Sequence, residues 1–341
     1  MEKNQWEIRE FLLKNLPDHP QDIVSLLAST FGFTRQRAHF YLAREVKKGT
    51  VVRVGKTRAT RYFLVGSKKL QVTLPLKSVT EDRVWGTYIR PMLNDYPENV
   101  QRVANYGFTE MLNNAIDHSE GTEVWIDVEI TDKALAFVIM DNGVGIFQKI
   151  KDALKLESER EAILHLSKGK FTTDPSRHTG EGIFFTSRMV DAFSILSDDL
   201  FYVFQGWEWF SSPEKPEPFG RGTSIRMVIN LDTKRTPKEV LDKYSNAEIG
   251  FHKTIVSVGL SSDPSDPHVS RSQAKRLMAG TEKFRTVILD FRGVKEVGQA
   301  FVDEIFRVFQ NEHPSIRIAY ANANPDVEAM IKRGLAESQA S

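Results

Sequence analysis

The chain has 341 residues, a net charge of +1, and a composition that is 40% hydrophobic and 27% charged, which excludes a protein that is disordered throughout. Its longest apolar run, residues 134–140, is far shorter than the roughly 18 residues of a membrane helix, and the charged first ten residues are not typical of a secretory signal. The absence of cysteine excludes disulfides, thiolate metal sites and cysteine nucleophiles. We therefore expect a cytoplasmic protein of two or three domains, without membrane association.

Basic charge is concentrated at the N-terminus. Residues 1–65 contain 12 lysines and arginines against 6 acids, so the rest of the chain carries a charge of −5. Three helices are predicted over residues 6–13, 20–31 and 34–48, the last begun by Thr34 as N-cap and ended by Gly49. Residues 50–65 predict a hairpin with a basic turn around Gly55. This order is typical of a winged helix-turn-helix domain over residues 1–66.

The third predicted helix has an apolar face and a basic face. A basic face on such a helix fits the major groove, where arginines and lysines attract phosphates. We therefore predict that DNA binds through residues 1–65. The alternative is a solvated basic face on a protein-docking module. The predicted DNA contacts are Gln36, Arg37, Arg44 and Lys47 on the helix and Lys56 and Arg58 in the hairpin turn.

Residues 70–236 predict a larger α+β domain. Its helices are expected over residues 80–93 and 98–118 and from about Gly182, and its strands over residues 123–131, 134–140, 193–196, 201–210 and 222–231. Residues 147–179 are expected to be a long irregular stretch, and residues 211–221 a surface loop.

From about residue 250 strands and helices alternate regularly. Strands are predicted over residues 254–260, 285–291 and 316–321, and helices over residues 269–280, 299–311 and 326–334. Such alternation predicts an α/β domain over residues 250–336, so the whole chain is predicted to be an α+β multidomain protein.

The second predicted helix of the central domain carries a polar stripe. Glu110, Asn114 and Asp117 follow one another at spacings of four and three residues, so they share one helix face. By itself this pattern is that of an amphipathic surface helix. Two glycine turns further along the chain change that interpretation.

The first turn begins at Asp141, at the end of a predicted strand, and contains Gly143 and Gly145. Glycines let the backbone approach a ligand closely, and a carboxylate there accepts a hydrogen bond from an exocyclic amine. The second turn, with Gly180 and Gly182, opens a helix whose free N–H groups would meet phosphate. A further glycine turn places Thr223 at the start of a strand.

In this order and spacing, over residues 75–235, these four elements resemble the GHKL ATPase superfamily, which includes type II topoisomerases, the ninety-kilodalton heat-shock chaperone, MutL, histidine kinases and anti-sigma serine kinases. The resemblance implies an α/β sandwich that binds ATP and Mg²⁺. It makes Glu110 the catalytic base, Asn114 the Mg²⁺ ligand and Asp117 a supporting acid. It places the adenine at Asp141, Gly143, Gly145 and Thr223 and the phosphates at Gly180 and Gly182.

The resemblance also implies that residues 147–179 form a mobile lid over the nucleotide. Basic side chains in this segment are then candidate phosphate contacts, the alternative being a solvated loop. These side chains are Lys168, Lys170, Arg177 and His178.

The resemblance leaves the reaction open. A histidine kinase would need a helical hairpin with a phospho-acceptor histidine before the domain, and residues 64–77 are too few to form one. Glu110 suits both ATP hydrolysis and phosphorylation of a serine or threonine, because each removes a proton from an attacking oxygen. We therefore expect an ATPase or a protein serine/threonine kinase, and not a typical histidine kinase.

The third domain resembles STAS-type anti-sigma antagonists through residues 286–294, followed by a helix. The antagonists carry a phosphorylated serine at the start of that helix, where this chain has Gly298, Gln299 and Ala300. None of the three can accept phosphate, so the resemblance implies an interaction module for an unknown protein partner.

Together these patterns favour a cytoplasmic regulator of transcription in which a nucleotide site switches a DNA-binding winged helix and a STAS-like module. The alternatives are a protein kinase of the anti-sigma type and a DNA-associated ATPase that dimerises through the nucleotide domain. The sequence leaves open the DNA sequence recognised, the protein partner and whether the chain forms a homodimer.

Overall fold

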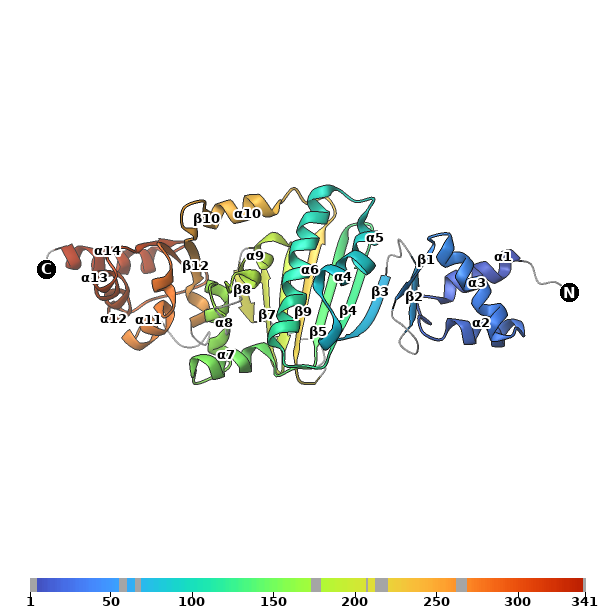
Figure 1. The fold of residues 1–341 in the computed structure, drawn as a ribbon. Helices are drawn as coiled ribbons and strands as arrows, with labels where there is room; N and C mark the ends of the chain where they lie inside the picture. Colours follow the sequence, from blue (N-terminus) through green and yellow to red (C-terminus); the bar gives the residue numbers. More distant parts are fainter. Residues whose placement is uncertain are drawn as a thin grey trace.

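The computed structural model describes residues 5–54, 60–64, 69–172, 179–206, 208–211, 220–261 and 269–339. The structure is elongated, with the two termini at opposite ends (Figure 1). An N-terminal unit of helices and a hairpin lies at one end, a seven-stranded sheet with its helices lies in the middle, and a three-stranded sheet lies at the other end. The prediction of an α+β protein is confirmed.

The N-terminal unit has a core of its own. Thr34 caps the third helix as predicted, since its Oγ1 accepts a hydrogen bond of 3.2 Å from the Arg37 N–H. Buried side chains from all three helices and the hairpin, including Ile8, Leu12 and Leu42, form one cluster. The elements are α1 (Gln5–Asn15), α2 (Ile23–Phe31), α3 (Arg35–Lys47) and the antiparallel hairpin of β1 (Val51–Val54) and β2 (Arg61–Leu64).

The central unit is built on an antiparallel sheet with the strand order β3-β4-β5-β9-β6-β7-β8. The sequence predicted one strand over residues 201–210, which is wrong. The structure has two strands there, because Gly206 takes a φ of 60° and turns the chain. The strands are β3 (Lys69–Pro75), β4 (Glu123–Ile130), β5 (Ala134–Asp141), β6 (Ala192–Ser197), β7 (Leu200–Gln205), β8 (Glu208–Ser211) and β9 (Thr223–Asn230).

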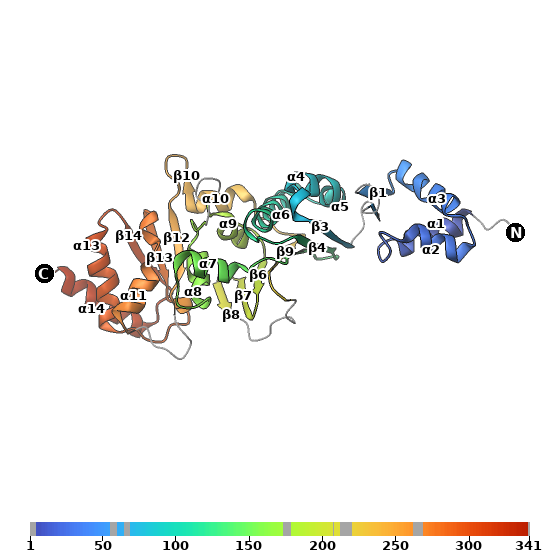
Figure 2. The same ribbon diagram turned by 60° about the horizontal axis from the view of Figure 1, so that its bottom comes forward.

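Helices cover one face of this sheet (Figures 1 and 2). They are α4 (Glu81–Val84), the π-helical η3 (Trp85–Ile89), α5 (Arg90–Leu93), α6 (Glu98–His118), α9 (Gly182–Met189) and α10 (Pro237–Tyr244). The apolar side of α6 packs on the sheet, where the Phe108 ring lies 5.5 Å from the ring of Phe137 on β5. The bounds of α6 are those the sequence predicted, whereas α10 was not predicted.

The segment predicted to be irregular, residues 147–179, is largely helical where the structure describes it. It contains α7 (Ile146–Leu154) and α8 (Arg160–Lys168). Each helix is only nine residues long and buries a narrow apolar side, with Phe147 and Ile150 on α7 and Ile163 and Leu166 on α8. Helices of this length are stabilised mainly by tertiary packing. Their short apolar pattern was not recognised in the sequence, because charged residues surround it.

The C-terminal unit contains a parallel sheet with the order β12-β13-β14. A two-stranded hairpin of β10 (Ser245–Asn246) and β11 (Gly250–Phe251), which was not predicted, precedes it. The strands are β12 (Lys253–Ser257), β13 (Thr286–Asp290) and β14 (Arg317–Ala321). The helices are α11 (Arg271–Met278), α12 (Gln299–Asp303) continued by η6 (Glu304–Phe309) and α13 (Gln310–Glu312), and α14 (Pro325–Gln339).

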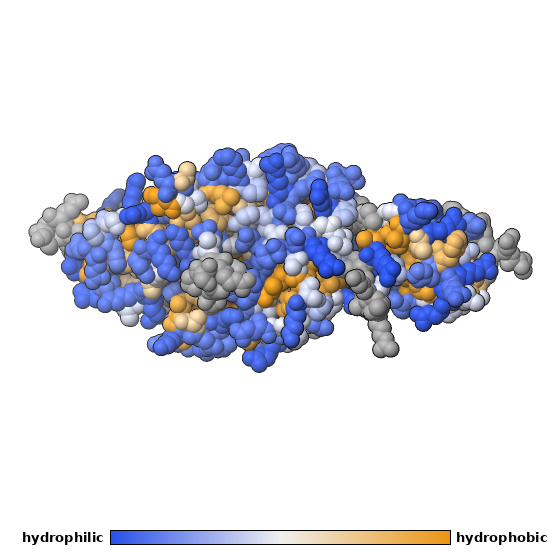
Figure 3. All heavy atoms as spheres, in the orientation of Figure 1, coloured by the Kyte–Doolittle hydropathy of each residue, from blue (hydrophilic) through white to orange (hydrophobic). Residues whose placement is uncertain are grey.

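One continuous hydrophobic core joins the central and C-terminal units, and it is separate from the N-terminal core. The outer face in Figure 3 is mainly hydrophilic, with small apolar patches. Large exposed apolar side chains come from different units and include Phe40, Phe210 and Ile249. Among the residues described, no helix combines the length and the apolarity that crossing a membrane requires.

Candidate functional site

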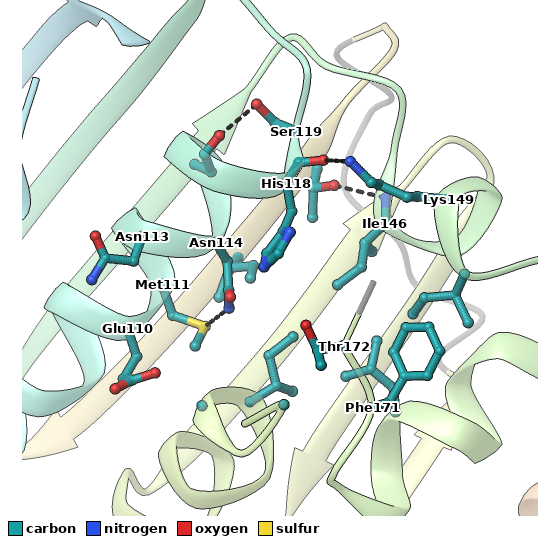
Figure 4. A pocket seen from close by; sticks show the side chains of 18 of the residues that line it. Glu110, Met111, Asn113, Asn114, His118, Ser119, Ile146, Lys149, Phe171 and Thr172 are labelled. Carbon is teal, nitrogen blue, oxygen red and sulfur yellow. Dashed lines mark hydrogen bonds between the residues drawn. The ribbon is translucent and has the colours of Figure 1, made fainter. Parts of the chain in front are cut away.

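A cavity of about 310 Å³ opens between the helix layer and one end of the central sheet. Figure 4 shows side chains of α6 on one side of it and Ile146, Lys149, Phe171 and Thr172 on the other. The ends of β5 and β9 and the start of α9 complete the wall. Elements far apart in the sequence therefore meet at one concave site, which is the arrangement typical of small-ligand pockets.

Asp141 is the buried acid of this cavity. It is the last residue of β5 and only 5% exposed, and its Oδ1 accepts hydrogen bonds from the N–H groups of Gly143 at 2.9 Å and Thr223 at 3.3 Å. Burial raises the pKa of Asp141 to about 6, although these two hydrogen bonds oppose the rise. With Oδ1 engaged by the backbone, Oδ2 is the oxygen placed to accept a hydrogen bond from a ligand.

The turn after Asp141 is held in place by one of its own side chains and by a side chain of β9. Asn142 Oδ1 accepts hydrogen bonds from the N–H groups of Thr122 at 2.8 Å and Glu123 at 3.1 Å. Thr223 Oγ1 accepts another, of 2.9 Å, from the Ile146 N–H at the start of α7. Both ends of the turn are thus fixed by hydrogen bonds within the protein.

α6 contributes further polar groups to the cavity. Glu110 and Asn114 line the cavity, and Asn113 and His118 line it with them. The Asn114 amide nitrogen contacts the Met111 sulfur at 3.9 Å, which leaves the amide oxygen as the group suited to a cation. Asn114 is therefore the α6 side chain best suited to hold a hard cation such as Mg²⁺.

The start of α9 lies directly against Glu110. A Cβ at Gly182 would lie 2.4 Å from Glu110 Oε2, so the carboxylate in this position packs directly on the glycine. Gly180, with a φ of 71°, is packed against the backbone of Phe171, where a Cβ would lie 2.3 Å from the Phe171 carbonyl oxygen. The result is a compact turn at a helix N-terminus, a position that favours anions.

Glu181 lies between these two glycines and also lines the cavity. Burial raises the pKa of its carboxyl, while the charge of Lys170 and a hydrogen bond from the Thr179 side chain oppose the rise. An acid at this turn would repel phosphate. The positive charge that offsets it comes from Lys170, which follows α8.

The structure brings together the predicted catalytic base and six of the residues predicted to bind nucleotide. They are Glu110, Asn114, Asp141, Gly145, Gly180, Gly182 and Thr223. Asp117 and Gly143 are outside the cavity lining. Gly143 instead packs against Ser119, where a Cβ would lie 2.0 Å from the Ser119 carbonyl oxygen.

Two of the predicted phosphate contacts are corrected by the structure. Lys168 is 1% exposed, and its ammonium points into the C-terminal unit, where it donates to main-chain carbonyls. Lys170 donates to the carbonyl of Lys283 at 3.1 Å, also in the C-terminal unit. Neither side chain lines the cavity, because both ammonium groups donate to main-chain carbonyls of residues 276–283 in the C-terminal unit. Arg177 and His178 lie outside the described residues.

Among the predicted DNA contacts, the structure describes those on α3. Gln36, Arg37, Arg44 and Lys47 are all exposed on one side of the helix, together with Phe40, which is 59% exposed. Lys56 and Arg58, in the hairpin turn, lie outside the described residues. The basic face predicted for this helix is therefore present on its surface.

Sequence reasoning missed several residues of the cavity. Lys149 of α7 donates hydrogen bonds to the His118 carbonyl at 2.5 Å and to Glu120 Oε1 at 2.9 Å, and so ties α7 to the end of α6. Lys149 follows Ile146 by three residues on a short amphipathic helix. That spacing could have predicted that both side chains lie on the same face of the helix. The other missed lining residues include Asn113, His118, Ser119, Phe171, Thr172 and Glu181.

Comparison with known families agrees with this geometry. Residues 101–233 match the family described as histidine kinase-, DNA gyrase B-, and HSP90-like ATPase, and residues 273–328 match a STAS-like domain of unknown function. The chain therefore contains a GHKL ATP-binding domain and a STAS-like domain. GHKL proteins bind ATP, typically with Mg²⁺. No curated protein matches the chain.

Proposed function

We propose that the cavity binds ATP with Mg²⁺ and that the chain is a nucleotide-dependent regulator. The observation that carries the ATP site is the buried Asp141 opposite a glycine turn at a helix start. A buried carboxylate suits an exocyclic amine, and the Gly180–Gly182 turn lines the cavity at the start of α9, where free N–H groups suit phosphate. The residues present therefore fit an adenine nucleotide.

Each residue has a distinct role in this proposal. Asp141 accepts a hydrogen bond from the adenine amine, and the N–H groups at the start of α9 bind the phosphates. The Asn114 amide oxygen holds the cation. Bound Mg²⁺ supplies positive charge that offsets the charge on the phosphate oxygens.

Glu110 is the proposed general base. Its carboxylate lies against the start of α9, beside the turn proposed to hold the phosphates. From there it removes a proton from an attacking oxygen, either that of water or that of a protein hydroxyl. ATP hydrolysis is the simpler reaction. Phosphorylation of a protein serine or threonine is the second candidate, and the STAS-like domain fused to the ATPase domain favours it.

One incubation distinguishes these reactions. The full chain is mixed with ATP labelled at the γ-phosphate, with and without DNA, and both free phosphate and labelled protein are followed. Free phosphate supports an ATPase, and label on an added protein supports a kinase. Glu110→Gln should lower either product by at least about 100-fold, because the amide cannot take the proton. An undiminished rate in Glu110→Gln contradicts the proposed base.

We further propose that the N-terminal unit binds DNA. Its exposed basic face on α3 carries Arg37, Arg44 and Lys47, which suit a phosphate backbone, and Gln36 near the helix start suits base edges. On this proposal the nucleotide site regulates the relation between DNA and a protein bound to the STAS-like domain. A protein kinase acting without DNA is the alternative.

A further inference from the structure

The end of α8 is inserted into the STAS-like domain. Lys168, the last residue of α8, donates hydrogen bonds to the carbonyls of Ala279 at 2.7 Å and Arg276 at 3.4 Å. These two carbonyls belong to the last turn and the C-cap of α11. Cations are favoured there, because the carbonyls at a helix C-terminus carry partial negative charge.

The main chain of Lys168 is held as well. Its carbonyl accepts a hydrogen bond of 2.7 Å from the hydroxyl of Thr254, a fully buried residue of the edge strand β12. Burial lowers the pKa of the Lys168 ammonium to about 7, although the charge of Glu282 opposes the change. A lysine buried this completely loses its hydration, so its contacts with α11 are specific.

The next two residues continue the contact. Gly169 has a φ of 79°, and a Cβ there would lie 2.7 Å from the ring of Phe251, so the chain is pressed against that ring. Lys170 donates to the Lys283 carbonyl, and the Lys283 ammonium donates to the Lys170 carbonyl at 3.4 Å. The Lys170 ammonium also lies 4.9 Å from the centre of the Phe284 ring.

The following two residues, Phe171 and Thr172, line the nucleotide cavity. The backbone of Phe171 also supports Gly180 in the turn proposed to hold the phosphates. Only two residues thus separate the buried Lys168 from the cavity wall. We name residues 169–172 the wall segment. It begins beside Lys168, which is held by the C-terminal unit, and ends at Phe171 and Thr172 in the cavity wall.

We propose that Lys168 and the two carbonyls it contacts, named here the Lys168 latch, set the position of the wall segment, so that the STAS-like domain controls nucleotide affinity. This inference rests on the proposed ATP site. With the latch formed, the wall is already in place and the cavity is ready for nucleotide. With the latch broken, nucleotide must order residues 169–172 itself, which lowers its affinity.

Linkage makes the control reciprocal. If the latch raises nucleotide affinity by some factor, bound nucleotide stabilises the latch by the same factor. A protein that binds the STAS-like domain and pulls α11 away from Lys168 would then lower nucleotide affinity. The STAS-like domain is therefore proposed to act as a regulatory domain for the ATPase domain of the same chain.

The test compares two full-length variants. Lys168→Met keeps an unbranched side chain of similar length but cannot donate to the α11 carbonyls. Lys133→Met is the matched control, because Lys133 is exposed in the turn between β4 and β5. By calorimetry with ATP and Mg²⁺, we expect Lys168→Met to bind at least about tenfold more weakly than the wild type and Lys133→Met to bind within about twofold.

A second measurement uses the wild type alone, so it does not depend on the folding of a variant. Hydrogen exchange of residues 271–283 should slow when ATP and Mg²⁺ are added, because nucleotide stabilises the latch. If Lys168→Met binds ATP with the same affinity as the wild type, the proposed latch is wrong. The proposal is also wrong if the wild type binds ATP but hydrogen exchange of residues 271–283 does not slow. A wild type that fails to bind ATP contradicts the proposed function instead, and the inference falls with it.

Discussion

The two junctions of the ATPase domain differ in kind. On the N-terminal side, the described contacts with the central unit include a hydrogen bond of 2.7 Å from Arg61 to the Thr73 carbonyl and the packing of Phe63 against Tyr88, whose ring centres are 5.4 Å apart. On the C-terminal side, one core runs through both domains without interruption. The STAS-like domain therefore cannot leave the ATPase domain without exposing a large shared core. The N-terminal unit, where the structure describes it, keeps most of its buried side chains in a core of its own and adds only Phe63 to the buried side chains of the central core.

Aromatic rings pack against one another at the C-terminal junction. Phe251 of β11 lies 4.5 Å from Phe184 and 4.9 Å from Phe185 of α9, and 5.1 Å from Phe284 of the STAS-like domain, measured between ring centres. The buried guanidinium of Arg188 lies 3.5 Å from the centre of the Phe184 ring, and burial lowers its pKa to about 10. Since α9 begins at the cavity, its other residues connect the site to the C-terminal junction by a second route.

The largest expected effect comes from breaking this junction. Phe251→Ala should destabilise the ATPase and STAS-like domains together by about 4 kcal/mol, because it leaves a cavity in their shared core. Denaturant unfolding followed by tryptophan fluorescence reports mainly on the ATPase domain, which holds four of the five tryptophans, and should show its transition at lower denaturant concentration. An unchanged unfolding midpoint for the ATPase domain in Phe251→Ala would show that the two domains are independent.

The matched substitution in the other core is Leu12→Ala. It should destabilise the N-terminal unit by about 3 kcal/mol and leave ATP affinity unchanged, because Leu12 belongs to a separate cluster. A fall in ATP affinity in Leu12→Ala would contradict the separation of the two cores.

A smaller effect is expected from pH. The folded state raises the pKa of Asp141 to about 6, so it binds a proton more readily than the unfolded chain does. Ionisation of Asp141 therefore lowers the free energy of unfolding as pH rises from about 4 to about 7, by about 3 kcal/mol. Asp141→Asn should lack this contribution. Unfolding curves of both proteins without nucleotide measure it, and identical pH profiles would refute the shift.

The smallest expected effect concerns DNA. Arg37→Ala should weaken DNA binding by about 1 kcal/mol and reduce its salt dependence, because one cationic contact with phosphate is lost. Titration at several salt concentrations checks this, with Lys133→Ala as the control. Equal binding by Arg37→Ala and the wild type would argue against α3 as the DNA-binding face.

The sequence predicted the parts of the site that depend on local pattern. Spacing along α6 placed Glu110 and Asn114 on one face, and the glycines after Asp141 marked a turn. The position of Lys168 could not be predicted in this way, because burial of a lysine depends on carbonyls more than a hundred residues further along the chain. For the same reason Phe251 gave no signal, since its partners come from α9 and from the STAS-like domain.

The most direct test of the ATP site is calorimetry of wild type and Asp141→Asn with ATP and Mg²⁺. In the variant, the amide oxygen should keep the hydrogen bonds from Gly143 and Thr223, so the amide nitrogen faces the ligand. The amide nitrogen of the variant and the adenine amine are both donors, so no hydrogen bond forms between them. We expect wild type to bind at one site per chain and Asp141→Asn to bind at least about 100-fold more weakly. Equal ATP affinity in the two proteins would contradict the proposed site.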